Sequence, residues 1–113
     1  MARYTLTARI RGKVTHERFD DVDAALGALE RRGHALQGQA DADVVGGSLV
    51  RRFEPEEQVT ARLELSGPGR LRLGVDVRGD GTAIPFTGRL IRKQVQRGDG
   101  ESAYDALRRV VRD

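Results

Sequence analysis

The sequence predicts an α+β fold in which an antiparallel sheet of five or six strands is covered on one face by two helices. Several stretches alternate apolar and polar residues with the two-residue period of a half-buried strand. Two others repeat apolar residues with a helical period, and Gly, Asp and Pro separate the stretches. The expected order is β-β-α-β-β-β-β-α. With 113 residues, the chain is expected to form a single domain over residues 1–113.

The first strand is predicted over residues 3–11, where apolar residues at the even positions alternate with Arg and Thr. Gly12 marks a turn, and residues 14–19 form a second strand whose two apolar ends lie an odd number of residues apart. A bulge near Glu17 would bring both ends to one face.

A helix is predicted from Asp20 onwards, with apolar residues at positions 22, 25, 26 and 29. Gly33 fits the left-handed residue that ends many helices, and His34 would then lie at the negative end of the helix dipole as a capping residue. Residues 34–47 are rich in small and polar types, so we expect a long loop there, with a short strand near Leu36 as the alternative.

Three more strands are predicted at residues 48–53, 58–65 and 71–78, of which the last two alternate most clearly. A three-residue loop at 67–69 would join the last two and pair apolar residues with apolar residues. A loop one residue shorter would turn one strand inside out.

The dipeptide Asp80-Gly81 predicts a two-residue hairpin, which pairs Val75 with Phe86 and directs Phe86 to the buried face. Pro85 lacks an amide donor and predicts an open edge or a bulge at the start of this last strand. The strand is expected to bend and continue to about Val95.

The second helix is predicted over residues 99–112, with Asp99 or Ser102 as its cap. Its buried stripe consists of apolar and aromatic residues at helical spacing: Ala103, Tyr104, Leu107, Val110 and Val111.

Composition excludes several kinds of chemistry. The chain has no Cys and two His, and no serine lies in a nucleophile motif, so we expect no enzyme, no cofactor and no metal site. Residues 41–46 begin like a calcium loop, but position 52 is Arg where the loop requires Glu. No apolar run suits a signal peptide or a membrane span, which predicts a cytoplasmic protein without a membrane partner.

The leading functional hypothesis is a non-enzymatic binding or assembly module that acts through protein contacts and forms a homo-oligomer. The surfaces that predict it are the edge marked by Pro85, the strand at residues 49–53 and the helix end at Val110 and Val111.

The alternative is RNA or DNA binding by an Arg-rich sheet face, although the net charge is only +3. Arg72 and Arg89 are expected as neighbours, which would make an anion site unless Glu64, expected opposite Arg72, neutralises them. Arg62 is expected diagonal to Asp76. We expect no aromatic platform on this face. The candidate contacts are Arg3, Arg9, Arg62, Arg70, Arg72, Arg78 and Arg89.

A third hypothesis is a small-ligand pocket between the sheet and the helices. His16 is expected to pair with Ala8 and face the core, and Gly74 and Gly88 would leave room. The candidate lining residues are His16, Gly74, Gly88 and Tyr104.

Overall fold

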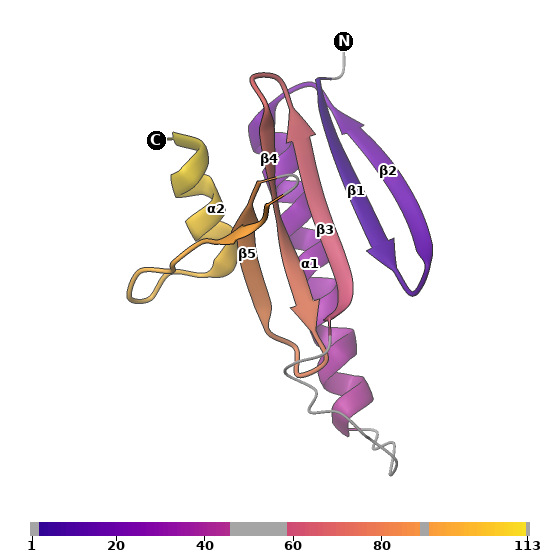
Figure 1. Ribbon diagram of the computed structural model, residues 1–113. Coiled ribbons are helices and arrows are strands. Elements are labelled where there is room, and N and C mark those ends of the chain that lie inside the picture. Colours follow the sequence, from indigo (N-terminus) through magenta and orange to yellow (C-terminus); the bar gives the residue numbers. More distant parts are fainter. Residues whose placement is uncertain (1–2, 46–58, 89–90, 113) are drawn as a thin grey trace.

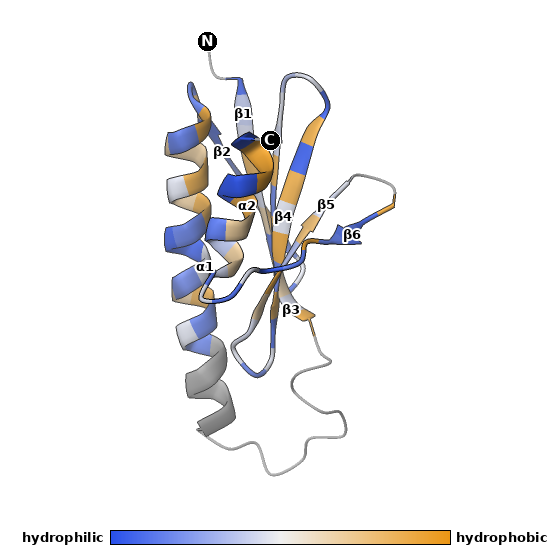
Figure 2. Cartoon of the chain, turned by 90° about the vertical axis from the view of Figure 1, so that its left-hand side faces the viewer, coloured by the Kyte–Doolittle hydropathy of each residue, from blue (hydrophilic) through white to orange (hydrophobic). Residues whose placement is uncertain are grey.

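The fold is an antiparallel six-stranded sheet with two helices on one of its faces (Figures 1 and 2). The computed structural model describes residues 3–45, 59–88 and 91–112, and the side chains of 40–45 are outside this description. The strand order is β2-β1-β3-β4-β5-β6. The predicted fold class and the element order β-β-α-β-β-β-β-α are confirmed.

The elements have the following bounds: β1 Tyr4–Ile10, β2 Lys13–Phe19, α1 Val22–Val45, β3 Val59–Gly67, β4 Leu71–Arg78, β5 Ala83–Thr87, β6 Lys93–Gln94 and α2 Ala103–Arg112. The strand predicted at residues 48–53 and the calcium-like residues from 46 on lie outside the described residues.

The first hairpin has a two-residue turn in which Arg11 and Gly12 both have positive φ, 49° and 82°. The register runs unbroken from Ile10 opposite Lys13 to Tyr4 opposite Phe19, so the bulge predicted near Glu17 was wrong. β2 is the last strand of the described sheet and is exposed from Lys13 through Arg18. An exposed edge strand does not need a consistent buried face. The odd spacing of its two apolar ends, Val14 and Phe19, therefore did not indicate a bulge.

Helix α1 begins after Asp21, whose Oδ1 accepts a hydrogen bond from Ala24 N at 2.7 Å. The helix does not end at Gly33 but continues to Val45, so the loop and the short strand predicted from residue 34 onwards were wrong up to this point.

Gly33 serves the packing of the two helices. A Cβ atom at this position would lie 2.0 Å from the Tyr104 hydroxyl, so only glycine lets the α2 ring rest on α1. His34 therefore lies within the helix and does not cap it. Its Nε2 is 3.3 Å from Glu30 Oε2, and its ring centroid is 4.9 Å from that of Tyr104.

The loop between β3 and β4 has three residues, as predicted, but they are Pro68, Gly69 and Arg70, because Gly67 pairs with Leu71. The register of β3 against β4 is therefore shifted by two residues from the predicted one. Because the shift is an even number of residues, the apolar residues stay on the predicted face. Leu65 lies opposite Leu73.

The loop between β4 and β5 differs from the predicted two-residue hairpin, and this difference changes which face Phe86 occupies. It spans residues 79–81, one residue longer than predicted, and Arg78 N donates to Thr82 O across it. Val75 consequently pairs with Pro85, and Phe86 pairs with Gly74. This one-residue difference moves Phe86 to the face opposite the helices.

The predicted continuation of the last strand was also wrong, because the chain reverses after β5. Gly88 has a φ of 100°, and a Cβ there would lie 2.2 Å from the carbonyl oxygen of Ile91. The two-residue strand β6 then pairs with Phe86 and Thr87, and Val95 N donates to Pro85 O. The edge expected at Pro85 is thus partly covered.

The core lies between the sheet and the two helices. α2 begins later than predicted, at Ala103, with Ser102 Oγ accepting from Asp105 N at 3.0 Å. The Tyr104 hydroxyl donates to Gln37 Oε1 at 2.5 Å, and Gln37 Nε2 donates to Gly81 O. The largest fully buried side chains are Leu6, Leu29, Leu63, Leu65, Leu73, Leu107, Val75, Val77 and Pro85.

Candidate nucleic-acid interface on the open sheet face

The sheet face opposite the helices, here called the open face, is organised around Glu64. Glu64 lies on β3 opposite Gly74, and its side chain is only 11% exposed. Three arginines approach its carboxylate: Arg9 Nε at 3.5 Å, Arg92 Nη2 at 3.5 Å and Arg72 Nη1 at 3.9 Å. One negative charge is thus shared by three guanidinium groups from three segments.

A second ion pair lies beside the first group. Arg62 is directly opposite Asp76, where a diagonal position was expected, and its Nε and Nη2 donate to the two carboxylate oxygens at 2.5 and 3.3 Å. The hydrogen bond to Asp76 raises the pKa of Arg62 despite partial burial. This guanidinium is therefore firmly held and always charged.

An aromatic ring also lies on the open face, contrary to the sequence expectation. Phe86 is 4% exposed because guanidinium groups cover it: the Arg92 and Arg62 Cζ atoms lie 5.5 and 5.8 Å from its ring centroid. Its ring fits over Gly74, where a Cβ would lie 2.8 Å from Phe86 Cζ. A glycine inside a strand is the sequence signal that could have located this close approach.

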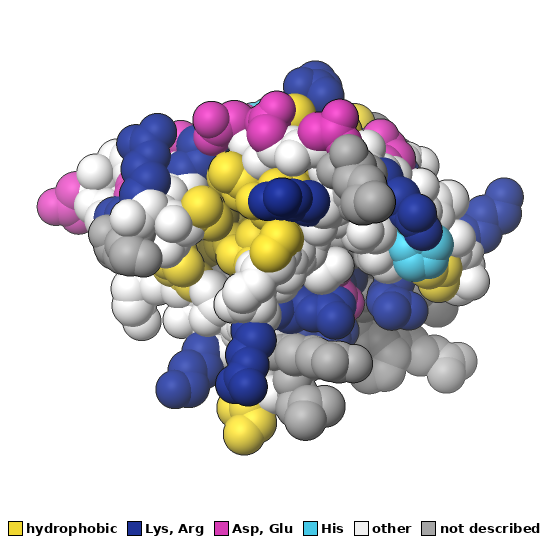
Figure 3. Space-filling model, turned by 90° about the horizontal axis from the view of Figure 1, so that it is seen from above, with side chains coloured by type: hydrophobic (Ala, Val, Ile, Leu, Met, Phe, Trp, Pro, Cys, Tyr) yellow, Lys and Arg dark blue, Asp and Glu magenta, His cyan; other side chains and the backbone are white. Residues whose placement is uncertain are grey.

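We call Arg9, Arg62, Arg72 and Arg92 the guanidinium cluster; it has four positive charges against the two of Glu64 and Asp76. In the end-on view of Figure 3, Asp and Glu gather mostly along the side where α1 lies, whereas Lys and Arg occur on several sides of the molecule. The cluster by itself thus has an excess of two positive charges, in a protein whose net charge is only +3.

The remaining candidate arginines are less closely grouped. Arg3 and Arg70 are exposed, at the start of β1 and in the β3–β4 loop, while Arg78 ends β4 and its Nε is buried without a hydrogen-bond partner among the described residues. Arg89 lies outside the described residues. Sequence reasoning missed Arg92, because only the chain reversal after β5 carries it over Phe86.

The four residues proposed to line a ligand pocket do not lie around a common pocket. His16 pairs with Thr7 and not with Ala8, so it is exposed on the open face, with Nδ1 3.0 Å from Thr7 Oγ1. Phe86 covers Gly74, the chain reversal requires Gly88, and Tyr104 packs against Gly33.

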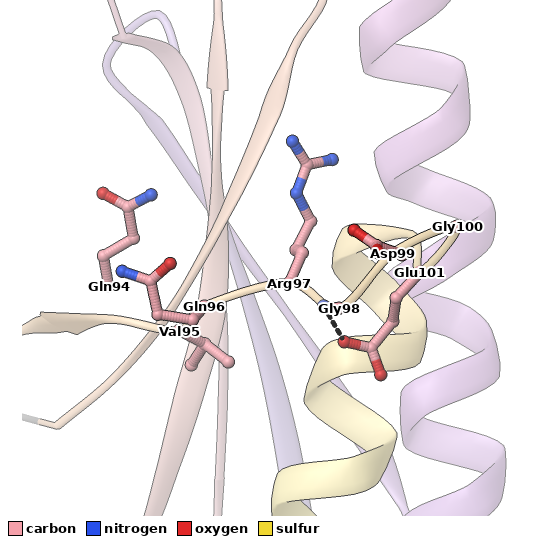
Figure 4. Close-up of a pocket in the computed structure, with 8 residues that line it drawn as sticks. All are labelled: Gln94, Val95, Gln96, Arg97, Gly98, Asp99, Gly100 and Glu101. Carbon is pink, nitrogen blue, oxygen red and sulfur yellow. Dashed lines mark hydrogen bonds between the residues drawn. The ribbon is translucent and has the colours of Figure 1, made fainter.

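A polar hollow lies elsewhere, lined by residues 94–101 before α2 (Figure 4). The carboxylate of Glu101 accepts hydrogen bonds from Arg109 Nε at 3.0 Å and Gly98 N at 2.8 Å. These bonds, the one from Arg109 first, lower the pKa of Glu101. Since Gly98 of the loop and Arg109 of α2 already donate hydrogen bonds to this carboxylate, we assign no ligand to the hollow.

Among the residues that the structure describes, no three His, Asp or Glu side chains gather to hold a metal ion. None of the helices, over their described lengths, is long and apolar enough to cross a membrane. No protein-family model matches the chain, and no curated protein or solved structure matches it significantly. The structure shows an antiparallel sheet with one helix-covered face and one open face that carries the guanidinium cluster.

Proposed function

We propose that the protein is a non-enzymatic nucleic-acid-binding module that holds the phosphate backbone of RNA or DNA on its open face. The observation that carries the proposal is the guanidinium cluster, in which four arginines share two carboxylates. The uncompensated charge attracts a polyanion, and guanidinium groups bind phosphate oxygens in pairs.

The cluster also offers flat surfaces for bases. The guanidinium groups of Arg62 and Arg92 lie over Phe86, which supports them from below. Unstacked bases of single strands stack on arginine planes as well as on aromatic rings. This arrangement favours single-stranded nucleic acid, bound without sequence preference.

We further propose a cytoplasmic location, which the sequence predicts because no apolar run suits a signal peptide. Assembly through protein contacts remains a prediction for the three surfaces that the sequence indicated: the Pro85 edge, the strand at residues 49–53, and the helix end at Val110 and Val111. Of these, Val110 and Val111 are half-buried, and residues 49–53 lie outside the described residues.

The test is the binding of a fluorescently labelled single-stranded oligonucleotide, followed by anisotropy over a range of salt concentrations. We expect a Kd of about 1–100 μM at physiological salt. The variant Arg72→Gln should weaken binding and reduce the slope of log K against log salt by about 0.7. Arg72 forms the longest of the three ion pairs to Glu64, so its loss should disturb the fold least.

The matched control is Arg31→Gln, which removes the same charge from an exposed position on α1, on the far side of the sheet. It should bind like the wild type. Binding that is absent at low salt, independent of salt, or weakened equally by both variants would refute the proposed function.

A further inference from the structure

Among the strands that the structure describes, none pairs with the outer edge of β2. In a two-residue hairpin, the pair beside the turn, here Ile10 and Lys13, exchanges hydrogen bonds. Lys13, Thr15 and Glu17 therefore direct their N–H and C=O groups toward β1. The same groups of Val14, His16 and Arg18 point away from the sheet, where the described sheet ends.

The sequence of this edge is complementary to itself. If two copies of β2 pair antiparallel with Thr15 facing Thr15, then Lys13 of each copy lies directly opposite Glu17 of the other. Val14 and His16 then form the hydrogen-bonded pairs. Opposite charges and paired threonines across strands are favourable, and Val14, which is 47% exposed, gains a covering neighbour.

Neighbouring registers are less favourable. Centring the pair on Glu17 sets two carboxylates against each other, and centring it on His16 leaves Lys13 and Glu17 only diagonal. Glu17 also accepts a hydrogen bond from Arg32 Nη1 at 2.8 Å, and this contact comes from α1, so it does not occupy the strand edge.

We propose that the β2 edge binds the β2 edge of a second copy of this chain, with Thr15 on the two-fold axis. An antiparallel pair of identical strands has its two-fold axis perpendicular to the sheet. The two sheets therefore join into one, and both open faces lie on the same side.

The dimer has a consequence that rests on the proposed function. Five strand spacings separate one β3 from the other, so the two Glu64 residues lie about 24 Å apart. A nucleic acid that reaches both guanidinium clusters would bind with avidity, although the clusters themselves are unchanged.

The first measurement is the mass of the full chain by light scattering over a concentration series, without nucleic acid. We expect the mass to rise to twice 12.4 kDa. Thr15→Lys places like charges on the axis at a position that is exposed in the monomer, so it should remain monomeric and folded.

The second measurement maps the register by disulfide formation, for which the chain is well suited because it has no Cys. Facing Thr15→Cys residues would have Cα atoms about 4.5 Å apart, within the range of a disulfide, so this variant should cross-link under mild oxidation. The matched control Val14→Cys places its two copies about 8 Å apart and should stay unlinked.

A mass of 12.4 kDa at every concentration would overturn the dimer, as would a dimer that Thr15→Lys leaves intact. Cross-linking of His16→Cys but not of Thr15→Cys would overturn the register. Since neither measurement contains nucleic acid, their failure is distinguishable from a failure of the proposed function.

Discussion

Replacing Glu64 by Gln separates a binding role of the guanidinium cluster from a purely structural one. The substitution removes three ion pairs of 3.5–3.9 Å, whose arginine side chains are 31–55% exposed. Exposed pairs contribute about 0.2–1 kcal/mol each, so the free energy of unfolding should fall by about 1–2 kcal/mol. This corresponds to a decrease in Tm of about 5–10 °C.

Nucleic-acid affinity should change in the opposite direction, because Glu64 repels phosphate and competes for the same arginines. Two like charges about 5 Å apart interact by about 0.8 kcal/mol in water, so the Kd should fall about fourfold. Thermal unfolding and oligonucleotide anisotropy measure the two effects. The control Asp105→Asn changes the net charge equally at a 60% exposed site on α2. If Glu64→Gln lowers Tm but leaves the Kd unchanged or raised, the cluster is structural only.

The other predictions concern stability. Gly33→Ala should destabilise the fold by about 2 kcal/mol in chemical denaturation, because Tyr104 occupies the space that the new methyl group needs. Gly38→Ala, in open space on the same helix, should stabilise the fold by up to about 1 kcal/mol. If the two variants changed the stability alike, the packing argument would be refuted. Burial, and then Glu30, raise the pKa of Tyr104 to about 12, so stability should decline as pH rises from about 10 to 12, and a Tyr104→Phe variant that keeps this decline would contradict it. The lowered pKa of Glu101 predicts that the stability advantage over Glu101→Gln, measured by urea titration, disappears as pH falls below about 4.5; a constant difference would exclude it.

Alternation located β1, β3 and β4 well, because each buries one face and no competing pattern interrupts it. The end of α1 was not predictable in this way. Gly33 has the residue type of a helix stop, and the reason for its presence lies 71 positions along the chain, in the ring of Tyr104.

The register of β5 explains why the sequence did not predict the aromatic part of the candidate site. Asp80-Gly81 is equally compatible with a two-residue and a three-residue loop, and Asp80 Oδ1 binds Thr82 N and Oγ1 in the longer one. The sheet adopts it because small residues, Ala83 and Pro85, then face the core, while Phe86 finds the space over Gly74. The Arg-rich face was predicted from β3 and β4, but its aromatic support was not.

The seam between β1 and β3 also determines how the chain folds. β1 with β2, and β3 with β4 and β5, are hairpins that form from nearby residues, whereas Leu6 meets Leu65 only after nearly sixty residues of intervening chain have been folded back. Both sides of the seam bury their apolar residues under α1. We therefore expect closure of this seam to limit the folding rate. Substitutions that weaken the packing of α1, such as those of its buried Leu29, should then slow folding more than they accelerate unfolding.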